Sequence, residues 1–499
     1  MYTYNLGKLF ERVCHDNSTG TAIVLENTTI TYQELSTRVQ EVSNWLLSNS
    51  VSRGDVVAIF NNKSITSYCI MLACLKIGAT YTNIDPASTG QRLQKMLNTC
   101  NPVMLFVYEE IQTNIDVSAI QVIDYVKDSL KCNDQYTYDE VPGDTIAYLM
   151  FTSGSTGFPK AVAISHSSII NFISWSRTTI RTTNHDRFTG VNPMHFDNSV
   201  FDFYSSLFTG ASLAPVPTAL LKNPRSVVKL LNKVAPTIWF SVPSMLVYML
   251  KMRSIATDDI GTIRMFVFGG EGFPKTQLRQ LWQMYRHQST FLNVYGPTEG
   301  TCICSSYEVS DSDIHDDSLL PLGKIAPNFD YVILDDKSNV TSKGELCLIG
   351  DNLAKGYYND NDRTKVSFQQ NPRCTNIIQL MYRTGDIVSQ DMDSVLHFHG
   401  RVDNQIKRMG HRIELEEIEV AIGSIPEVIE SAVLYIDAEP TDSKIVAYVS
   451  KNNAVEVLPY LRKTLPYYMI PDEIIYVQML PKNRSGKVDR LQLKKDYLK

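Results

Sequence analysis

Along the first part of the chain, hydrophobic positions follow two patterns: a helical spacing and short continuous runs. Apolar residues recur at helical spacing over residues 35–46, directly after Thr31 and Glu34. A threonine three positions before a glutamate, followed by this spacing, predicts a capping box and an amphipathic helix. Short apolar runs then predict a strand at Asp55–Phe60, a helix at Ser67–Ile77 and a strand at Thr80–Ile84. The alternation predicts a parallel α/β layer.

Polar or glycine-rich clusters follow three later apolar runs. The runs are Ile238–Phe240, Met265–Phe268 and Phe291–Val294, and the clusters are Ser241–Ser244, Gly269–Gly272 and Tyr295–Glu299. Ligands of open α/β sheets bind beyond the carboxyl ends of the strands. We therefore expect these clusters to converge on one crevice.

The pattern restarts after about residue 400. A helix is predicted at Glu414–Ile422, with strands at Ser431–Ile436 and Lys444–Val449. The predicted fold class is α/β: a large, multi-layered N-terminal domain of sheets and packed helices (residues 1–400) and a small, mobile α+β C-terminal domain (residues 401–499).

Composition restricts the possible partners and location. The chain has 499 residues, 43% of them hydrophobic, and a net charge of -6 without a basic cluster. This distribution argues against nucleic acid and anionic membranes as partners. No signal peptide and no run near ~18 apolar residues is present, so we expect a cytoplasmic protein. The nine cysteines form no C-x-x-C pair and are expected to be reduced thiols.

The segment Thr152–Lys160 combines flexibility with anion-binding groups. Gly154 and Gly157 let the backbone approach an anion, and successive N–H groups can surround it. The hydroxyl donors are Thr152, Ser153, Ser155 and Thr156, and Lys160 adds a positive charge. The spacing differs from a Walker A loop. It predicts a polyphosphate-binding loop, with a flexible surface turn as the alternative.

Two further segments carry parts of a nucleotide site. In Asn293–Glu299, Tyr295 is suited to stack on a base, Thr298 to bond a phosphate and Glu299 to bind Mg²⁺. Asp386, after a glycine turn, is suited to accept hydrogen bonds from ribose hydroxyls. Read singly, each segment is also compatible with an ordinary turn.

Together the segments resemble the adenylate-forming superfamily. Five motifs occur in the expected order: Thr152–Lys160, Tyr295–Glu299, Tyr382–Asp386, Gly400–Lys407 and Asn483–Arg490. Within the superfamily the chain is most similar to stand-alone amino-acid adenylation domains, including the D-alanine:D-alanyl carrier protein ligases and adenylation domains of non-ribosomal peptide synthetases. Phe196–Asp202, Ile238–Ser244 and Leu465–Pro471 add to this similarity.

The resemblance implies a two-step ligase reaction with ATP and Mg²⁺. An amino-acid carboxylate attacks the α-phosphorus of ATP, releasing pyrophosphate, and a thiol then takes the aminoacyl group. Lys487 is expected to bridge the carboxylate and ATP, and Lys160 with its loop to bind the β- and γ-phosphates. The remaining ATP contacts implied are Gly270, Glu271, Asn293, Val294, Tyr295, Gly296, Pro297, Thr298, Asp386 and Arg401, with Glu299 as the metal ligand.

The resemblance also implies a conformational change. Asp403 falls at the family's hinge position, about which the C-terminal domain is expected to rotate. It would present Lys487 for adenylation and the segment Lys407–Gly410 for thioester formation.

Asp197 matches the residue that binds the α-ammonium group in amino-acid-activating members, which favours an amino acid over a fatty acid. The side-chain pocket implied by position comprises Asn198, Phe201, Phe240, Val267, Gly269, Val294, Cys302 and Ile303. It lacks charge and resembles pockets for small to branched aliphatic side chains. Phe240 and Gly269 depart from the D-alanine ligases, and one methylene contributes only ~1–3 kcal/mol, so the amino acid stays open.

The acceptor is expected to be the phosphopantetheine thiol of a separate carrier protein, because no carrier segment follows Lys487. Coenzyme A is the alternative thiol. An acyl- or aryl-coenzyme A ligase of the same fold is the main alternative function, and it predicts activity that survives Asp197→Ala. A catalytically silent nucleotide-binding protein is the third possibility.

Overall fold

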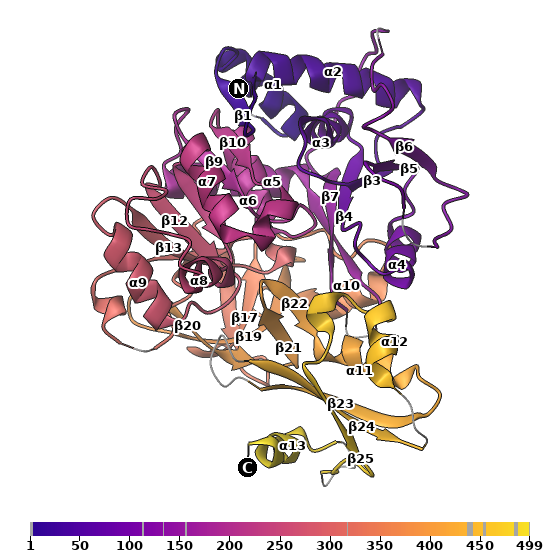
Figure 1. Cartoon of the computed structure of the whole chain (residues 1–499), viewed down its shortest axis with the longest axis vertical. Coiled ribbons are helices and arrows are strands. Elements are labelled where there is room, and N and C mark those ends of the chain that lie inside the picture. The colour runs from indigo at the N-terminus through magenta and orange to yellow at the C-terminus, as the bar shows by residue number, and fades with distance from the viewer. Residues whose placement is uncertain are drawn as a thin grey trace.

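The protein is built from several sheets with helices between and outside them, followed by a smaller C-terminal unit (Figure 1). The computed structural model describes residues 3–111, 114–132, 134–154, 157–316, 318–436, 443–452, 456–483 and 488–498. Ser155, Thr156 and Lys487, three residues assigned to the ATP site, lie outside this range.

A six-stranded sheet carries the predicted phosphate loop. In spatial order its strands are β6 (Gln121–Asp124), β5 (Met104–Val107), β3 (Val56–Phe60), β4 (Thr80–Ile84), β7 (Ile146–Thr152) and β8 (Lys160–Ser165). All neighbours are parallel except β7 and β8, which form a hairpin. The predicted strands at Asp55–Phe60 and Thr80–Ile84 are confirmed as β3 and β4.

A nine-stranded sheet carries the predicted nucleotide and substrate residues. Its order is β15 (Lys324–Ile325), β14 (Ser305–Glu308), β13 (Thr290–Tyr295), β12 (Met265–Gly269), β11 (Ile238–Ser241), β9 (Arg187–Gly190), β10 (Ser212–Pro215), β1 (Thr21–Val24) and β2 (Thr29–Thr31). The six strands from β13 to β1 run parallel. β2 is antiparallel to β1, β14 to β13, and β15 to β14. The carboxyl ends of β11, β12 and β13 therefore meet at one edge, as predicted.

Five helices share one apolar core with both sheets: α1 (Leu6–Asp16), α2 (Tyr32–Ser48), α3 (Ile65–Ile77), α5 (His166–Ile180) and α6 (Asn198–Leu207). The predicted capping box is present at α2, where Thr31 and Glu34 bond each other's backbone N–H groups. The outer faces are covered by α4 (Gly90–Cys100) on the six-stranded sheet and by α7 (Pro224–Val234), α8 (Pro243–Lys251) and α9 (Lys275–Tyr285) on the nine-stranded sheet.

A third sheet completes the larger domain. It contains β16 (Asp330–Leu334), β17 (Lys343–Ile349), β18 (Phe368–Gln370), β19 (Leu380–Gln390) and β20 (Leu396–Arg401), with α10 (Asn361–Ser367) beside it. The short 3₁₀ helices are η1 (Thr218–Lys222), η2 (Thr298–Gly300), η3 (Ser312–Ile314) and η4 (Tyr467–Met469).

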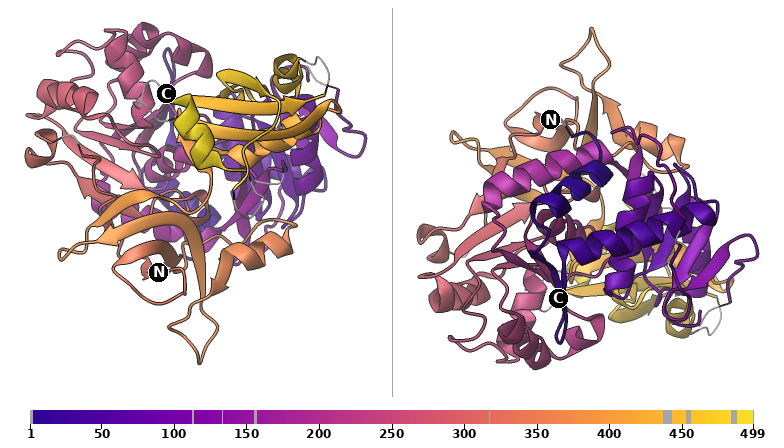
Figure 2. Two further views of the ribbon diagram at one scale, coloured as in Figure 1. Left: turned by 90° about the horizontal axis from the view of Figure 1, so that it is seen from below. Right: turned by 90° about the horizontal axis from the view of Figure 1, so that it is seen from above.

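The C-terminal domain lies at the end of the molecule opposite α1 and α2 (Figures 1 and 2). It begins with a hairpin of β21 (Gln405–Arg408) and β22 (His411–Glu414). A three-stranded sheet follows, formed by β23 (Val428–Ile436), β24 (Lys444–Lys451) and β25 (Glu473–Val477). Its helices are α11 (Leu415–Gly423), α12 (Val457–Thr464) and α13 (Arg490–Tyr497).

Two separate cores cover the two faces of this small sheet. Ile418 of α11 and Leu461 of α12 pack with Val433 on one face. Leu493 of α13 packs with Leu434 and Leu480 on the other. The helices on both faces are thereby fixed to one sheet. Among the described helices, none has the length and apolar character needed to cross a membrane.

Candidate active site between the two domains

Ten of the predicted site residues line one cavity of about 810 Å³ that is open to solvent, whereas the predicted side-chain residues other than Asn198 do not line it. From the larger domain it includes Thr152, Ser153, Asp197, Asn198, Gly270, Gly296, Pro297, Thr298, Asp386 and Arg401. From the C-terminal domain it includes Gln405, Lys407, Gly410, His411 and Arg412. Residues more than 250 positions apart in the chain thus meet at the loop ends of both large sheets.

The phosphate loop begins at Thr152, the last residue of β7, and returns at Lys160, its partner in the β7–β8 register. A side chain at Gly154 would lie 2.1 Å from the Phe158 carbonyl oxygen, so this turn requires glycine. Gly157 has a φ of +74°, which also favours glycine. The buried Thr152 hydroxyl has no hydrogen-bond partner among the described residues. It is therefore available to a phosphate oxygen.

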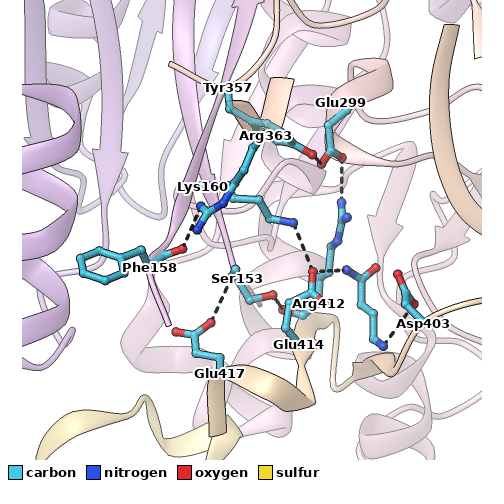
Figure 3. Close-up of polar contacts among 12 residues, drawn as sticks. Ser153, Phe158, Lys160, Glu299, Tyr357, Arg363, Asp403, Arg412, Glu414 and Glu417 are labelled. Atoms are coloured by element: carbon cyan, nitrogen blue, oxygen red, sulfur yellow. Dashed lines mark hydrogen bonds and ion pairs between the residues drawn. The ribbon is translucent and has the colours of Figure 1, made fainter. Parts of the chain in front are cut away.

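Lys160 points from β8 toward the C-terminal domain (Figure 3). Its ammonium lies 3.2 Å from a carboxylate oxygen of Glu414, and both side chains are largely buried. Burial and the nearby positive charge of Arg412 lower the pKa of Lys160. The negative charges of Glu299 and Glu414 raise this pKa, but they offset only part of the decrease. Additional negative charge, such as that of a polyphosphate, would favour the charged lysine.

Glu299 is fully buried in η2, directly after β13. Its carboxylate accepts hydrogen bonds from the Tyr357 hydroxyl at 2.8 Å and from Arg412 at 2.7 Å. Burial raises the pKa of Glu299, but the charges of Arg412 and Lys160 outweigh it and hold the pKa at about 2. An ionised carboxylate beside a phosphate loop fits the oxygen ligand that Mg²⁺ prefers. In this arrangement Arg412 contacts that carboxylate.

Asp386, in β19, is bonded by protein groups from two directions. The Tyr295 hydroxyl donates to one carboxylate oxygen, and Arg401 forms an ion pair with the other. Arg401 also donates to Asp403 at 2.6 Å, which links the proposed hinge residue to the ribose position. Asn293 was also predicted to contact ATP. Its side-chain amide donates a hydrogen bond to the Pro321 carbonyl at 2.8 Å.

Asp197 precedes α6 but makes no capping bond with that helix. Its carboxylate instead accepts a hydrogen bond from the Thr298 hydroxyl at 2.5 Å. Burial raises the pKa of Asp197, while the Thr298 hydrogen bond and the charge of Lys407 only partly oppose this effect. The Asp197 side chain therefore does not cap α6, although the residue stands at the N-cap position. The carboxylate faces the cavity, where a cationic ligand group would stabilise it.

The predicted side-chain pocket is apolar and tightly packed. Phe201 and Phe240 lie with ring centroids 4.7 Å apart. The other buried members are Val267, Val294, Cys302 and Ile303. Burial raises the pKa of the Cys302 thiol, so the pocket carries no thiolate. Gly269 pairs with Val294 across β12 and β13, and a side chain there would lie 2.1 Å from the Val294 carbonyl oxygen.

The sequence reasoning missed the contacts of the C-terminal hairpin with this site. The Ser153 hydroxyl donates to the Arg412 carbonyl at 2.7 Å, and the Gly410 N–H donates to Glu271 at 3.2 Å. Glu417, in the first turn of α11 directly after the hairpin, accepts from the Gly154 N–H at 3.2 Å and pairs with Arg92 of α4. The only sequence signal was the run of alternating charged and apolar residues over His411–Glu417.

Lys487 lies outside the described residues, but its flanks are placed. Lys482 and Val488 form a β-bridge, and Val488 packs with Leu480 and Leu493. That core is on the sheet face opposite α11 and α12. The hairpin lines the cavity, whereas the described flanks of Lys487 pack on the opposite face of the small sheet.

The family model described as "AMP-binding enzyme" matches residues 10–358, and the model of the "AMP-binding enzyme C-terminal domain" matches residues 417–487. The chain belongs to the AMP-binding enzyme family. It is therefore a member of a family of ATP-dependent ligases, as the five ordered motifs predicted.

Curated relatives include both stand-alone ligases and large synthetases. An L-proline--[L-prolyl-carrier protein] ligase of Pseudomonas fluorescens is 31% identical over 97% of this chain and 98% of its own length. Tyrocidine synthase 3 of Brevibacillus parabrevis is 32% identical over 95% of this chain, which spans 7% of that protein.

Solved structures share the fold. The Vibrio cholerae adenylation domain AlmE, in complex with glycyl-adenosine-5′-phosphate, has a TM-score of 0.79 and 23% identity over 100% of this chain and 98% of its own. A protein containing adenylation and PCP domains, bound to a vinylsulfonamide inhibitor, has a TM-score of 0.85 and 23% identity over 99% and 84%. The predicted α/β fold class is confirmed.

Proposed function

We propose that this AMP-binding enzyme activates an amino acid with ATP and transfers it to the thiol of a separate carrier protein. The observation that carries the proposal is the carboxylate of Asp197, which faces the same cavity as the phosphate loop. A carboxylate in this position pairs with an α-ammonium group, whereas a simple acyl substrate would leave it buried without a cation.

In the first step the amino-acid carboxylate attacks the α-phosphorus of ATP, and the bond to the β,γ-pyrophosphate breaks. Both reactants are anions, so positioned cations lower the barrier. Lys160 and the backbone of its loop bind the leaving pyrophosphate, and Lys487 bridges the attacking carboxylate and the α-phosphate. A magnesium ion held by Glu299 would add positive charge beside the phosphates.

In the second step a thiolate attacks the carbonyl carbon of the aminoacyl-adenylate, and AMP leaves. The hairpin β21–β22 lies in the cavity in a position suited to this step, with Lys407 and Gly410 lining it. The Lys407 ammonium lies 5.4 Å from the centre of the Tyr295 ring. It is therefore placed to oppose negative charge on the departing AMP.

The residues assigned to the amino-acid side chain, among them Phe201 and Phe240, are uncharged, mostly apolar and closely packed, which favours a small to branched aliphatic amino acid. A charged side chain would be desolvated there without a partner. The carrier protein as acceptor is supported by the prolyl-carrier protein ligase, which matches this chain over nearly its full length.

The test is ATP–pyrophosphate exchange over a panel of amino acids, including both enantiomers of alanine, valine and isoleucine. A small or branched aliphatic member should stimulate exchange. No stimulation by any amino acid, together with coenzyme A consumption in the presence of a carboxylic acid lacking an amino group, would contradict the proposal.

A further inference from the structure

The nine-stranded sheet splits at its carboxyl edge between β9 and β11. β9 stays paired with β10 as far as Gly190, and β11 stays paired with β12 as far as Ser241. Between β9 and β11, two strands that the structure describes in full, the register contains a single pair, Phe188 with Ile238. The chain continues from β9 to β10 on one side and returns to β11 on the other. The split is therefore the switch point of the sheet, where ligands of open α/β sheets bind.

Side chains replace the missing backbone pairing at Phe240, the third residue of β11. The Phe240 N–H donates to the Thr189 hydroxyl at 3.3 Å, and the Phe240 carbonyl accepts from the side-chain amide of Asn192 at 3.0 Å. Thr189 lies in β9, and Asn192 lies in the segment that follows it. On this side, the main chain of Phe240 is therefore held by two side chains and not by a neighbouring strand.

Asn192 also bonds α6. Its amide donates at 2.9 Å to one carboxylate oxygen of Asp202, and the other oxygen has no hydrogen-bond partner among the described residues. Asn192 and Asp202 are 6% and 3% exposed, so the bond is shielded from solvent. Asp202 directly follows Phe201, whose ring lies 4.7 Å from the ring of Phe240. One buried amide thus joins the two elements that carry Phe201 and Phe240.

The segment that carries Asn192 is itself fixed to the sheet. The buried ammonium group of Lys63 donates to three carbonyls at 2.7, 3.0 and 3.0 Å, those of Gly190, Val191 and Val216. These bonds use all three donors of a charged ammonium group. The end of β9 is therefore held beside β10, and Asn192 spans the gap to β11 from a fixed position.

We propose that Asn192 determines amino-acid specificity by setting the distance between Phe201 and Phe240, and with it the width of the side-chain site. The inference rests on the proposed function, because it uses the role assigned to these two phenylalanines. Asn192 is a positioning residue, since it acts through the two rings and not through a contact with the substrate.

Small changes in this distance should alter selection strongly, because one methylene group in an apolar site changes it by about 10- to 200-fold. Without the Asn192 amide, the Asp202 carboxylate and the Phe240 carbonyl each lose a buried partner. Nothing polar then joins α6 to β11 at this point among the described residues. The two elements can separate, and the site should accept a longer side chain.

The test measures ATP–pyrophosphate exchange by the full-length protein with its preferred amino acid and with the homologue one methylene longer. In Asn192→Ala, the ratio of the two kcat/KM values should fall at least about fivefold, mainly through a lower KM for the longer amino acid. A loss of folded enzyme lowers both values equally, so it leaves the ratio unchanged. Asn192→Ser, which keeps one donor on a shorter side chain, should act in the same direction and decides the matter if the alanine variant does not fold.

Two further variants separate the bridge from a general loosening of α6. Asp202→Asn retains an oxygen that accepts from Asn192, so the ratio should stay close to that of the wild type. Ser205→Ala removes a different buried bond of the same helix, to Ser176 of α5, and should also leave the ratio unchanged.

An unchanged ratio in the Asn192 variants, or an equal fall in Ser205→Ala, would overturn the proposal. If no amino acid stimulates exchange in the wild type, the proposed function fails and the inference fails with it. If the wild type selects one amino acid and the Asn192 variants select it equally well, the inference fails alone.

Discussion

Asp197 is the residue that ties the cavity to a class of substrate. Its carboxylate is held by Thr298, whose backbone belongs to the nucleotide-binding turn. The group that would bind the α-ammonium is thus fixed to the group that would contact the phosphate. Correct placement of one substrate helps to place the other, which reduces the entropic cost of bringing two reactants together.

Replacement of Asp197 by alanine should remove the partner of the substrate ammonium. Loss of a buried charge pair typically costs about 2–5 kcal/mol, which corresponds to a loss of roughly 30-fold to several thousand-fold in kcat/KM for the amino acid. The KM for ATP should change little. Steady-state exchange kinetics with the activating amino acid will measure both. An unchanged amino-acid kcat/KM would contradict the assigned role and favour a substrate without an amino group.

His166 makes a contribution to stability that depends on pH. It is fully buried at the start of α5, and its Nδ1 accepts a hydrogen bond from the Leu6 N–H at 3.0 Å. Burial lowers the pKa of His166 from 6.5 to about 4, so the folded protein holds the neutral ring. Above pH 6.5 the ring is neutral in both the folded and the unfolded chain. As the pH falls from 6.5 toward 4, only the unfolded chain binds a proton at this ring, so the free energy of unfolding decreases.

Compared with His166→Gln, the wild type should therefore lose about 3 kcal/mol more of its free energy of unfolding between pH 7 and pH 4. Urea titrations of both proteins at several pH values will give the difference. Parallel pH curves for the two proteins would show that burial of this ring does not control the effect.

At the scale of elements, local sequence patterns were sufficient to predict helices and strands whose contacts lie within one sheet or one helix. β3 was predicted to within one residue of its observed bounds because a buried parallel strand is a continuous apolar run between polar residues. The capping box of α2 was likewise predictable, since all of its partners lie within four residues.

The cap of α2 gives a direct test at this scale. Thr31→Ala removes the oxygen that accepts from the Glu34 N–H, at a typical cost of about 1 kcal/mol. Hydrogen exchange in the first turn of α2 should become about fivefold faster, since RT is about 0.6 kcal/mol. Thr37→Ala, exposed in the same helix, is the control and should leave the first turn unchanged. Equal rates in wild type and Thr31→Ala would contradict the prediction.

The contacts between the hairpin and the phosphate loop could not be predicted from the sequence. Lys160 and Glu414 are 254 residues apart, and Gly154 and Glu417 are 263 apart. Neither pair has a local pattern, because each contact depends on how the two domains are oriented. The sequence motifs predicted a set of residues for the nucleotide site, but they did not predict that Glu414 and Glu417 would contact two of them.

At the scale of the whole molecule, the C-terminal domain carries the hairpin and the flanks of Lys487 on opposite faces of one sheet. The hairpin adjoins α11 on one face, and the flanks of Lys487 pack with α13 on the other. Since both faces belong to the same sheet, the two segments cannot enter the cavity together. We therefore expect adenylation to require rotation of the domain about the segment near Asp403.

A disulfide across the domain boundary should test this requirement. A Cβ at Gly410 would lie 3.4 Å from the Cβ of Val242, close to the separation in disulfides. In Val242→Cys/Gly410→Cys, oxidation should lower ATP–pyrophosphate exchange by at least about 10²-fold, and reduction should restore it.

Each single cysteine variant, treated with the same oxidant, is the control. Gly410 has a φ of +78°, so a cysteine there is strained by itself, and the effect of the bond is read only from the difference between oxidised and reduced protein. Full exchange in quantitatively cross-linked enzyme would show that the domain need not rotate.

The register of β12 and β13 also limits how the specificity of this enzyme can change, in nature or by engineering. At Gly269 the obstacle to a larger residue is the main chain of the neighbouring strand, which cannot move aside as a side chain can. We therefore expect amino-acid selection to change more readily through Phe201, Phe240 and Ile303, whose side chains pack in the core and offer alternatives in size. A mutant library for new substrates should vary these three positions and keep Gly269 constant.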